Sequence, residues 1–177
     1  MIDIFDIMGP IMVGPSSSHT AGAVRIGRMA RTLLGDEPVK ASIHLHGSFA
    51  ETGVGHGTDK ALVAGLLGMP PDDLDIPQSF DIAADRGLKF MFDWQDLRDA
   101  HPNSVLLELV GASDRRLSMQ ACSTGGGRIL VTRLDGVDVG FTGDYHTLIV
   151  QNMDNKGNLS DVATALALAR VNVANMS

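Results

Sequence analysis

The densest group of reactive side chains in the sequence is a run of hydroxyls that begins at Gly14 and reads GPSSSHT. Apolar and small residues recur at helical spacing after it, from Ala23 to Leu34, so the run directly precedes a helix. The free N–H groups and the positive dipole end of a helix N-terminus favour an anion, and serine hydroxyls add donors. One serine would suffice as a cap, so the run favours a site for a small carboxylate or phosphate over simple capping. The candidate binding residues, together called the serine loop, are Ser16, Ser17, Ser18, His19 and Thr20.

A second group surrounds one histidine with glycines, in the stretch TGVGHGTD from residue 52 to residue 59. Glycines let a ligand approach the backbone, and an imidazole, with an ordinary pKa of about 6.5, suits proton transfer near neutral pH. His56 is therefore the candidate general base, the alternative being a surface or helix-terminal histidine without a chemical role. Thr58 and Asp59 are candidate supporting residues. Asp59 either orients His56 or complements the dipole in the first turn of a helix.

A third group is the sequence STGGG, which ends in three consecutive glycines between two predicted strands. Successive N–H groups of such a turn can form a nest for an anion, although a flexible bulge or hairpin explains the glycines equally well. These residues, called the glycine loop, are candidates for backbone contact with a substrate or a partner chain. They are Gly125, Gly126 and Gly127.

Two further patterns carry weaker signals. His44 and His46 lie two residues apart on one face of a predicted strand, a spacing also found in metal sites, but no acid or cysteine pair flanks them. No metal site is therefore predicted in this chain. Arg25, Arg28 and Arg31 form a ridge at helical spacing that is interpreted as a solvated face, with a surface for an acidic partner as the alternative.

The elements that must position these groups are predicted from hydrophobic periodicity. Ser17 or Ser18 caps a first helix that stops at Gly35, a second helix begins within residues 52–58 and ends at Gly68, and a third spans residues 79–86. Alternating or continuous apolar residues predict strands at residues 39–46, 88–92, 104–110, 117–122, 128–134 and 137–141. The predicted fold class is α+β, with a mostly antiparallel sheet and packed helices.

The last 33 residues are predicted to form a separate unit, because the segment after Asp144 has no net charge whereas the rest of the chain is acidic. Residues 147–152 are expected to be a strand, 159–169 a helix and 171–176 the start of a second strand. A β-α-β start without partner strands leaves sheet edges open, so we expect a truncated unit. The predicted domains are 1–144 and 145–177.

Composition excludes several classes of function. An apolar share of 44% and a charged share of 20% are typical of a globular chain, and a net charge of −7 disfavours nucleic acid as a partner. The longest apolar run, residues 61–69, is about half of the ~20 residues that a membrane span requires, so no membrane association is expected. The single cysteine, Cys122, fits the reducing cytoplasm and cannot hold an iron-sulfur cluster alone.

Three stretches together resemble a known family: GPSSSHTAGA, HGSFAETGVGHGTDKALVAGLLG and STGGGRI. Their order and content resemble the beta chain of the bacterial iron-sulfur L-serine dehydratase, over nearly the whole chain. The tail from Ile149 is similar to the opening of an ACT domain, a small regulatory ligand-binding module. One residue departs from the family, because His46 stands where a tyrosine is usual, and it is assigned no catalytic role.

The resemblance implies a lyase that converts L-serine to pyruvate and ammonia with a [4Fe-4S] cluster. In this family the alpha chain holds the cluster, so the resemblance implies activity only with an alpha chain, in a cytoplasmic enzyme that is expected to be a homo-oligomer of beta or alpha-beta units. On this resemblance, an iron of the cluster would supply a Lewis acid for the β-hydroxyl. The serine loop would hold the substrate carboxylate and His56 would remove the Cα proton, while the fold would resemble an allosteric substrate-binding domain.

Two other functions remain open at this stage. The first is a non-catalytic module that senses L-serine, as in some phosphoglycerate dehydrogenases. Fusion to a dinucleotide-binding domain would favour this function. The second is a stand-alone metal hydrolase built from the histidines. Stoichiometric zinc in the isolated chain would favour this function.

Overall fold

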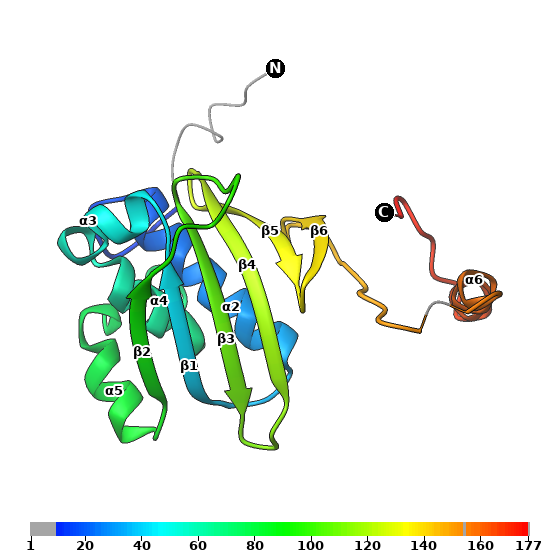
Figure 1. The fold of residues 1–177 in the computed structure, drawn as a ribbon, viewed down its shortest axis with the longest axis horizontal. Coiled ribbons are helices and arrows are strands. Elements are labelled where there is room, and N and C mark those ends of the chain that lie inside the picture. The colour runs from blue at the N-terminus through cyan, green and yellow to red at the C-terminus, as the bar shows by residue number, and fades with distance from the viewer. Residues whose placement is uncertain (1–9, 154, 177) are drawn as a thin grey trace. The chain divides into compact units, whose positions relative to one another are not determined.

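The computed structural model describes residues 10–153 and 155–176, and it divides the chain into two compact units, Met1–Asp144 and Tyr145–Ser177. In the first unit, helices pack against one face of a sheet (Figure 1). The predicted α+β class, with a mostly antiparallel sheet and packed helices, is thereby confirmed.

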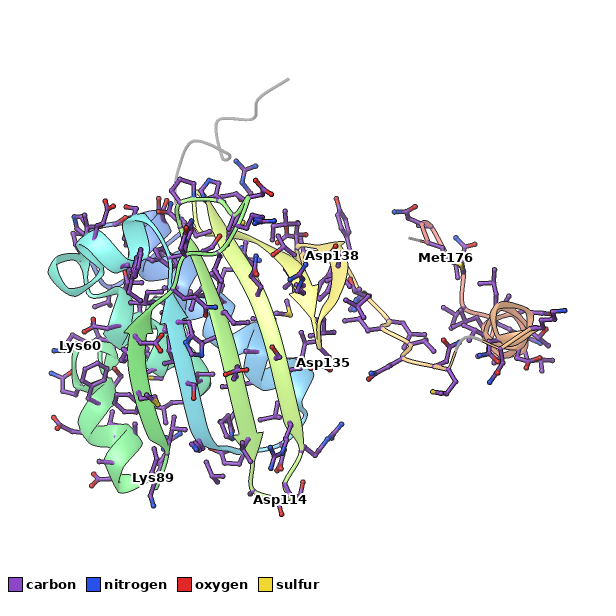
Figure 2. All side chains as sticks on the ribbon, viewed as in Figure 1. Lys60, Lys89, Asp114, Asp135, Asp138 and Met176 are labelled. Carbon is purple, nitrogen blue, oxygen red and sulfur yellow. The ribbon has the colours of Figure 1, made fainter. Side chains whose placement is uncertain are left out.

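The sheet of the first unit has six strands in its described part, in the order β2-β1-β3-β4-β5-β6. Neighbouring strands are antiparallel except for β1 and β2, which are parallel because helices form the crossover between them. Lys89, at the start of β2, and Asp114, in the turn between β3 and β4, mark one end of the sheet (Figure 2). The strands are β1 (Pro38–Leu45), β2 (Lys89–Trp94), β3 (Ser104–Gly111), β4 (Arg116–Gly125), β5 (Arg128–Leu134) and β6 (Val137–Phe141).

The core lies between the sheet and the helices. Ala41 and Ile43 of β1 and Leu107 of β3 are fully buried, and Val24 and Ile26 meet them from the helix layer. These buried residues are the apolar positions whose alternation predicted the strands and whose helical spacing predicted the first helix. The helices and helical turns of the first unit are η1 (Ser17–Gly22, a π-helical turn), α2 (Ala23–Leu34), α3 (Ser48–His56), α4 (Thr58–Leu66), η2 (Ile76–Gln78) and α5 (Ser79–Asp85).

The helix predicted to begin within residues 52–58 and to end at Gly68 is α4, and a further helix that was not predicted, α3, precedes it. α3 begins earlier, at Ser48, and α4 begins at Thr58. Gly57 separates them with a φ of 70°, in the left-handed region that terminates a helix. Glycines lower the helix propensity of this stretch. Burial of Phe49, which has no exposed surface, supplies the tertiary packing that stabilises α3 nonetheless.

α2 and α4 approach each other so closely that their contact needs glycine. A methyl group on Gly65 would lie 2.2 Å from the carbonyl oxygen of Val24, and one on Gly27 would lie 2.4 Å from that of Leu62. Both neighbours are backbone atoms of the opposite helix. The serine loop leads into α2, and His56 is separated from α4 by Gly57 alone, so this contact determines how far apart the two motifs lie.

The arginine ridge of α2 is largely engaged within the protein. Arg31 donates to the carbonyl of Leu66 at 2.9 Å and forms an ion pair with Glu37. Arg25 donates to a backbone carbonyl and to a carboxylate of the same unit. Arg28 is exposed. The ridge is partly solvated, as interpreted, and in addition two of its three members are bonded within the first unit.

The described part of the second unit contains one helix, α6 (Asn158–Leu168), as predicted for residues 159–169. The strands predicted at 147–152 and 171–176 are not formed there, because a strand requires a neighbouring strand to satisfy its backbone groups. No buried residue belongs to α6. Across the described residues of both units, no helix has the length and apolar content to cross a membrane.

Candidate functional site

The three predicted motifs meet at the end of the sheet opposite Lys89 and Asp114. β1 and β4 both end there; α3 follows β1, and the glycine loop joins β4 to β5. A methyl group placed on Gly125 would lie 3.9 Å from Ser18 Oγ, so the glycine loop borders the serine loop. The hydroxyl of Thr20 donates to the carbonyl of His56 at 3.4 Å, which ties the serine loop to the end of α3.

The serine loop begins a helix through a wide turn. Ser16 has an extended backbone, and its Oγ accepts the N–H of His19 at 3.1 Å, so Ser16 is the N-cap. Ser17 or Ser18 had been predicted as the cap, and that prediction is wrong because both already belong to the π-helical turn η1. Their half-buried side chains lie where the first turn leaves N–H groups unpaired.

His19 is buried and held on both ring nitrogens by hydroxyl groups. Its Nε2 lies 3.1 Å from Thr52 Oγ1 and 3.2 Å from Ser48 Oγ, and its Nδ1 lies 3.4 Å from Ser16 Oγ. The Thr52 hydroxyl donates to the Ser48 carbonyl at 2.9 Å, so the Thr52 oxygen accepts from Nε2–H. This assigns the ring proton of neutral His19 to Nε2 and leaves Nδ1 to accept from Ser16.

His56 lies beside His19, with 5.0 Å between the ring centroids. Burial lowers the pKa of His19, and the neighbouring His56 lowers it further, because a charged imidazole there would be poorly solvated and repelled. His19 is therefore neutral at neutral pH. His56 differs in being exposed, and a methyl group on the flanking Gly55 or Gly57 would meet no atom within 4 Å. The glycines leave the surroundings of the His56 ring open, as the sequence predicts.

The glycine loop has a backbone conformation that other residues rarely adopt, with φ angles of 97°, 60° and 75° along Gly125–Gly127. A methyl group on Gly127 would lie 3.5 Å from Ala21 Cβ. Just before the loop, the fully buried Ser123 Oγ would be 2.2 Å from a methyl group on Gly22, and it has no hydrogen-bond partner among the described residues. The loop thus lies directly against the turn that carries the serine loop.

Thr58 and Asp59 begin α4 and differ in their surroundings. Thr58 is fully buried, and its hydroxyl has no hydrogen-bond partner in the described part of the chain. The Asp59 carboxylate accepts the N–H of Lys60 at 2.8 Å. Asp59 and His56 are both described residues, and no hydrogen bond joins them. This geometry favours the alternative in which Asp59 complements the dipole at the start of α4.

Ser48 and Thr52 are residues of the site that no sequence motif singled out. They lie four residues apart on one face of α3, and both direct their hydroxyls to the same nitrogen of His19. The polar i, i+4 pair was a usable signal. It indicates a shared face only on a helix, and no helix was predicted at residues 48–51.

His44 of β1 and His46, which follows that strand, form their side-chain hydrogen bonds with residues outside the three motifs. His44 lies between two carboxylates, with its Nδ1 2.6 Å from Asp93 and its Nε2 3.2 Å from Glu108. His46 accepts the N–H of Leu97 at 3.2 Å through its Nδ1. Within residues 10–153 and 155–176, no group of three His, Cys, Asp or Glu side chains is arranged to hold a metal ion.

Comparison with known proteins gives the same family as the motifs. The sequence profile of the family described as "Serine dehydratase beta chain" matches residues 1–85. The probable L-serine dehydratase beta chain of Bacillus subtilis is 42% identical over 98% of this chain and 78% of its own length. The L-serine dehydratase beta chain of Peptoniphilus asaccharolyticus is 39% identical over the same shares of the two chains.

A more distant relative has a longer chain. L-serine dehydratase TdcG of Escherichia coli is 27% identical over 90% of this chain, and the match covers 39% of that enzyme. Two relatives above 30% identity, each matched over 98% of this chain, and the profile match confirm the resemblance drawn from the motifs. This chain belongs to the L-serine dehydratase beta-chain family.

Proposed function

We propose that this chain is the beta subunit of a lyase that removes water from L-serine, so that the resulting enamine hydrolyses to pyruvate and ammonia. The observation that carries the proposal is the meeting of the serine loop, the glycine loop and the His19–His56 pair at one end of the sheet. An amino acid substrate needs an anion site for its carboxylate and, near it, a base for its Cα proton. This end of the sheet offers both.

The serine loop is the proposed carboxylate site. Ser17 and Ser18 lie in the first helical turn, where unpaired N–H groups and the helix dipole favour a negative charge. His19 and Thr20 are buried behind them, which fixes the loop. Ser16 has a structural duty as well, since it caps the helix and faces Nδ1 of His19.

His56 is the proposed base that takes the Cα proton. Both ring nitrogens of His19 already face hydroxyls, so His19 has no lone pair to spare for the substrate. The His56 ring is exposed toward the space left by its flanking glycines. Keeping His19 neutral also prevents it from repelling the imidazolium that His56 becomes on accepting the proton. His19 thus serves as a neutral neighbour and not as the base.

The donor set of this chain does not fit an iron-sulfur cluster. Such clusters are held by several cysteine thiolates, whereas this sequence has one cysteine, Cys122, which is buried and whose pKa is raised by burial. We therefore assign the [4Fe-4S] cluster to an alpha chain. The match to 39% of the longer TdcG chain supports a division of such an enzyme into two parts.

The test compares this chain alone with the complex formed by anaerobic co-expression with its alpha chain. Alone, it should form no pyruvate from L-serine and show no iron absorbance. In the complex, His56→Asn should lower kcat by about 10²-fold or more with little change in KM, because general-base catalysis contributes ~10² to 10⁴. Iron content should not change.

The matched control is His44→Asn, which replaces a histidine of β1 whose ring bonds to two carboxylates and to no residue of the three motifs. Its kcat should stay within about twofold of the unsubstituted complex, well below the ~10² effect of a lost base. Near-normal turnover of His56→Asn would reject His56 as the base. An effect confined to KM would make His56 a binding residue, and activity of the chain alone would refute the two-subunit proposal.

A further inference from the structure

The side chain of Arg25 connects the glycine loop to the end of the first unit. Arg25 lies on α2, where its Nη1 donates to the carbonyl of Gly127 at 2.9 Å. Its Nη2 donates to Oδ1 of Asp144 at 2.7 Å. One guanidinium therefore bonds to a glycine of the candidate site and to the residue after which the second unit begins.

The glycine loop is a tight turn whose ends are joined by the pairing of Gly125 of β4 with Arg128 of β5, and Gly126 and Gly127 lie between them. Its three residues have no side chains that could anchor it, and glycine backbones lose the most conformational entropy when they are fixed. Gly127 lies against Pro10 and Ala21, and the bond from Arg25 is the side-chain hydrogen bond that holds its carbonyl. A charged donor makes this a stronger bond than one between two neutral groups.

Asp144 in turn fixes the direction of the Arg25 side chain. An arginine has many rotamers, and a carboxylate on one side of the guanidinium selects the rotamer that reaches Gly127. The hydrogen bond from Arg25 holds the pKa of Asp144 below its usual range, so Asp144 is ionised at neutral pH. Both side chains are about one-third exposed, so the pair is accessible to water but not fully solvated.

We propose that Arg25 is a positioning residue that holds the glycine loop against the serine loop, and that Asp144 acts on the loop through Arg25. The inference rests on the proposed function, because it gives the loop a part in binding L-serine. It also means that the last residue of the first unit contributes to the geometry of the substrate site. A change in the chain at Asp144 would then reach the site without any contact between the two units.

The first test needs no substrate. Hydrogen exchange of the amides of residues 124–128 is followed by mass spectrometry in the full beta chain and in Arg25→Met. Loss of the bond to Gly127 should speed exchange there by about tenfold, since local opening governs the protection of such a segment. Arg28→Met is the matched control, because Arg28 lies on the same helix and is exposed. Equal exchange in Arg25→Met and Arg28→Met would overturn the inference, whatever the enzyme does.

The second test uses the complex with the alpha chain. Arg25→Met should raise KM for L-serine by about tenfold, the lower limit for a lost charged hydrogen bond, and leave kcat within about twofold. Adding Asp144→Asn to Arg25→Met should raise KM no further, because Asp144 acts through Arg25. Additive effects would overturn that part of the inference. Faster exchange with an unchanged KM would instead reject the glycine loop as part of the substrate site, and an inactive wild-type complex would reject the proposed function alone.

Discussion

Replacing Gly65 with alanine tests whether the close contact of α2 and α4 holds the site together. The added methyl group would lie 2.2 Å from the carbonyl oxygen of Val24 and 2.9 Å from the backbone nitrogen of Arg28. Neither atom can move by a side-chain rotation, so the helices must separate by roughly 1 Å to restore ordinary contact distances.

The magnitude follows from two opposing effects. Overpacking of a well-packed core costs about 1–3 kcal/mol and occasionally more, and the upper part of this range applies because the contact is with backbone. Alanine returns about 1 kcal/mol in helix propensity relative to glycine. The net loss in the free energy of unfolding should be about 2 kcal/mol, which in a chain of this size lowers Tm by roughly 4–8 °C.

The assay is urea and thermal unfolding of the full chain, with Gly55→Ala as the matched control. Gly55 is also helical, but a methyl group there would meet no atom within 4 Å, so this variant should be as stable as the parent or more stable by up to about 1 kcal/mol. In the complex, Gly65→Ala should also raise KM, because the serine loop and His56 move with the two helices. A Gly65→Ala chain as stable as the parent would refute the argument.

Two further predictions concern other parts of the first unit. Ser17→Ala should raise KM for L-serine by about tenfold to a hundredfold, the effect of one lost hydrogen bond to a charged group, whereas an unchanged KM in initial-rate kinetics of the complex would reject Ser17 as a carboxylate ligand. The Arg31 hydrogen bond holds the pKa of Glu37 below its usual 4.5, so the pair stabilises the fold above that pH and ceases to do so as pH falls through the lowered pKa. Glu37→Gln should therefore be less stable by at most about 1 kcal/mol at pH 7, given the exposure of the pair, and the difference measured by urea unfolding should vanish in acid; a constant difference at all pH values would contradict this.

Local patterns predicted the elements whose periodicity is strong. The helix that ends at Gly35 and the strands from β3 to β6 were found because their apolar spacing agrees with the faces that they bury. The start of α3 was missed for the opposite reason. Its two glycines, Gly53 and Gly55, obscure helix propensity, and what stabilises it is the burial of Phe49, which no local pattern reveals.

The residue types of the candidate site were predictable from the sequence, whereas the contacts between their side chains were not. The serine loop, His56 and the glycine loop were identified from local sequence motifs. The pairing of His19 with Ser48 and Thr52, however, depends on a helix that begins 29 residues away along the chain. The contact of Arg25 with Asp144 spans 119 residues. Such relations follow from the packing of α2 against both α4 and the sheet, which sequence spacing cannot specify.

The exposure of His56 gives a physical reason for a second subunit in the proposed reaction. A base that removes a weakly acidic Cα proton gains from a site that excludes water, because electrostatic interactions there are stronger than in bulk solvent. In this chain the two histidines of the site differ: His19 is buried, whereas His56 faces open space. The substrate would thus be held on one side by the serine loop and left uncovered on the other. An alpha chain that closes this side would supply the missing wall together with the cluster, which would make the separated beta chain inactive even if L-serine binds to it.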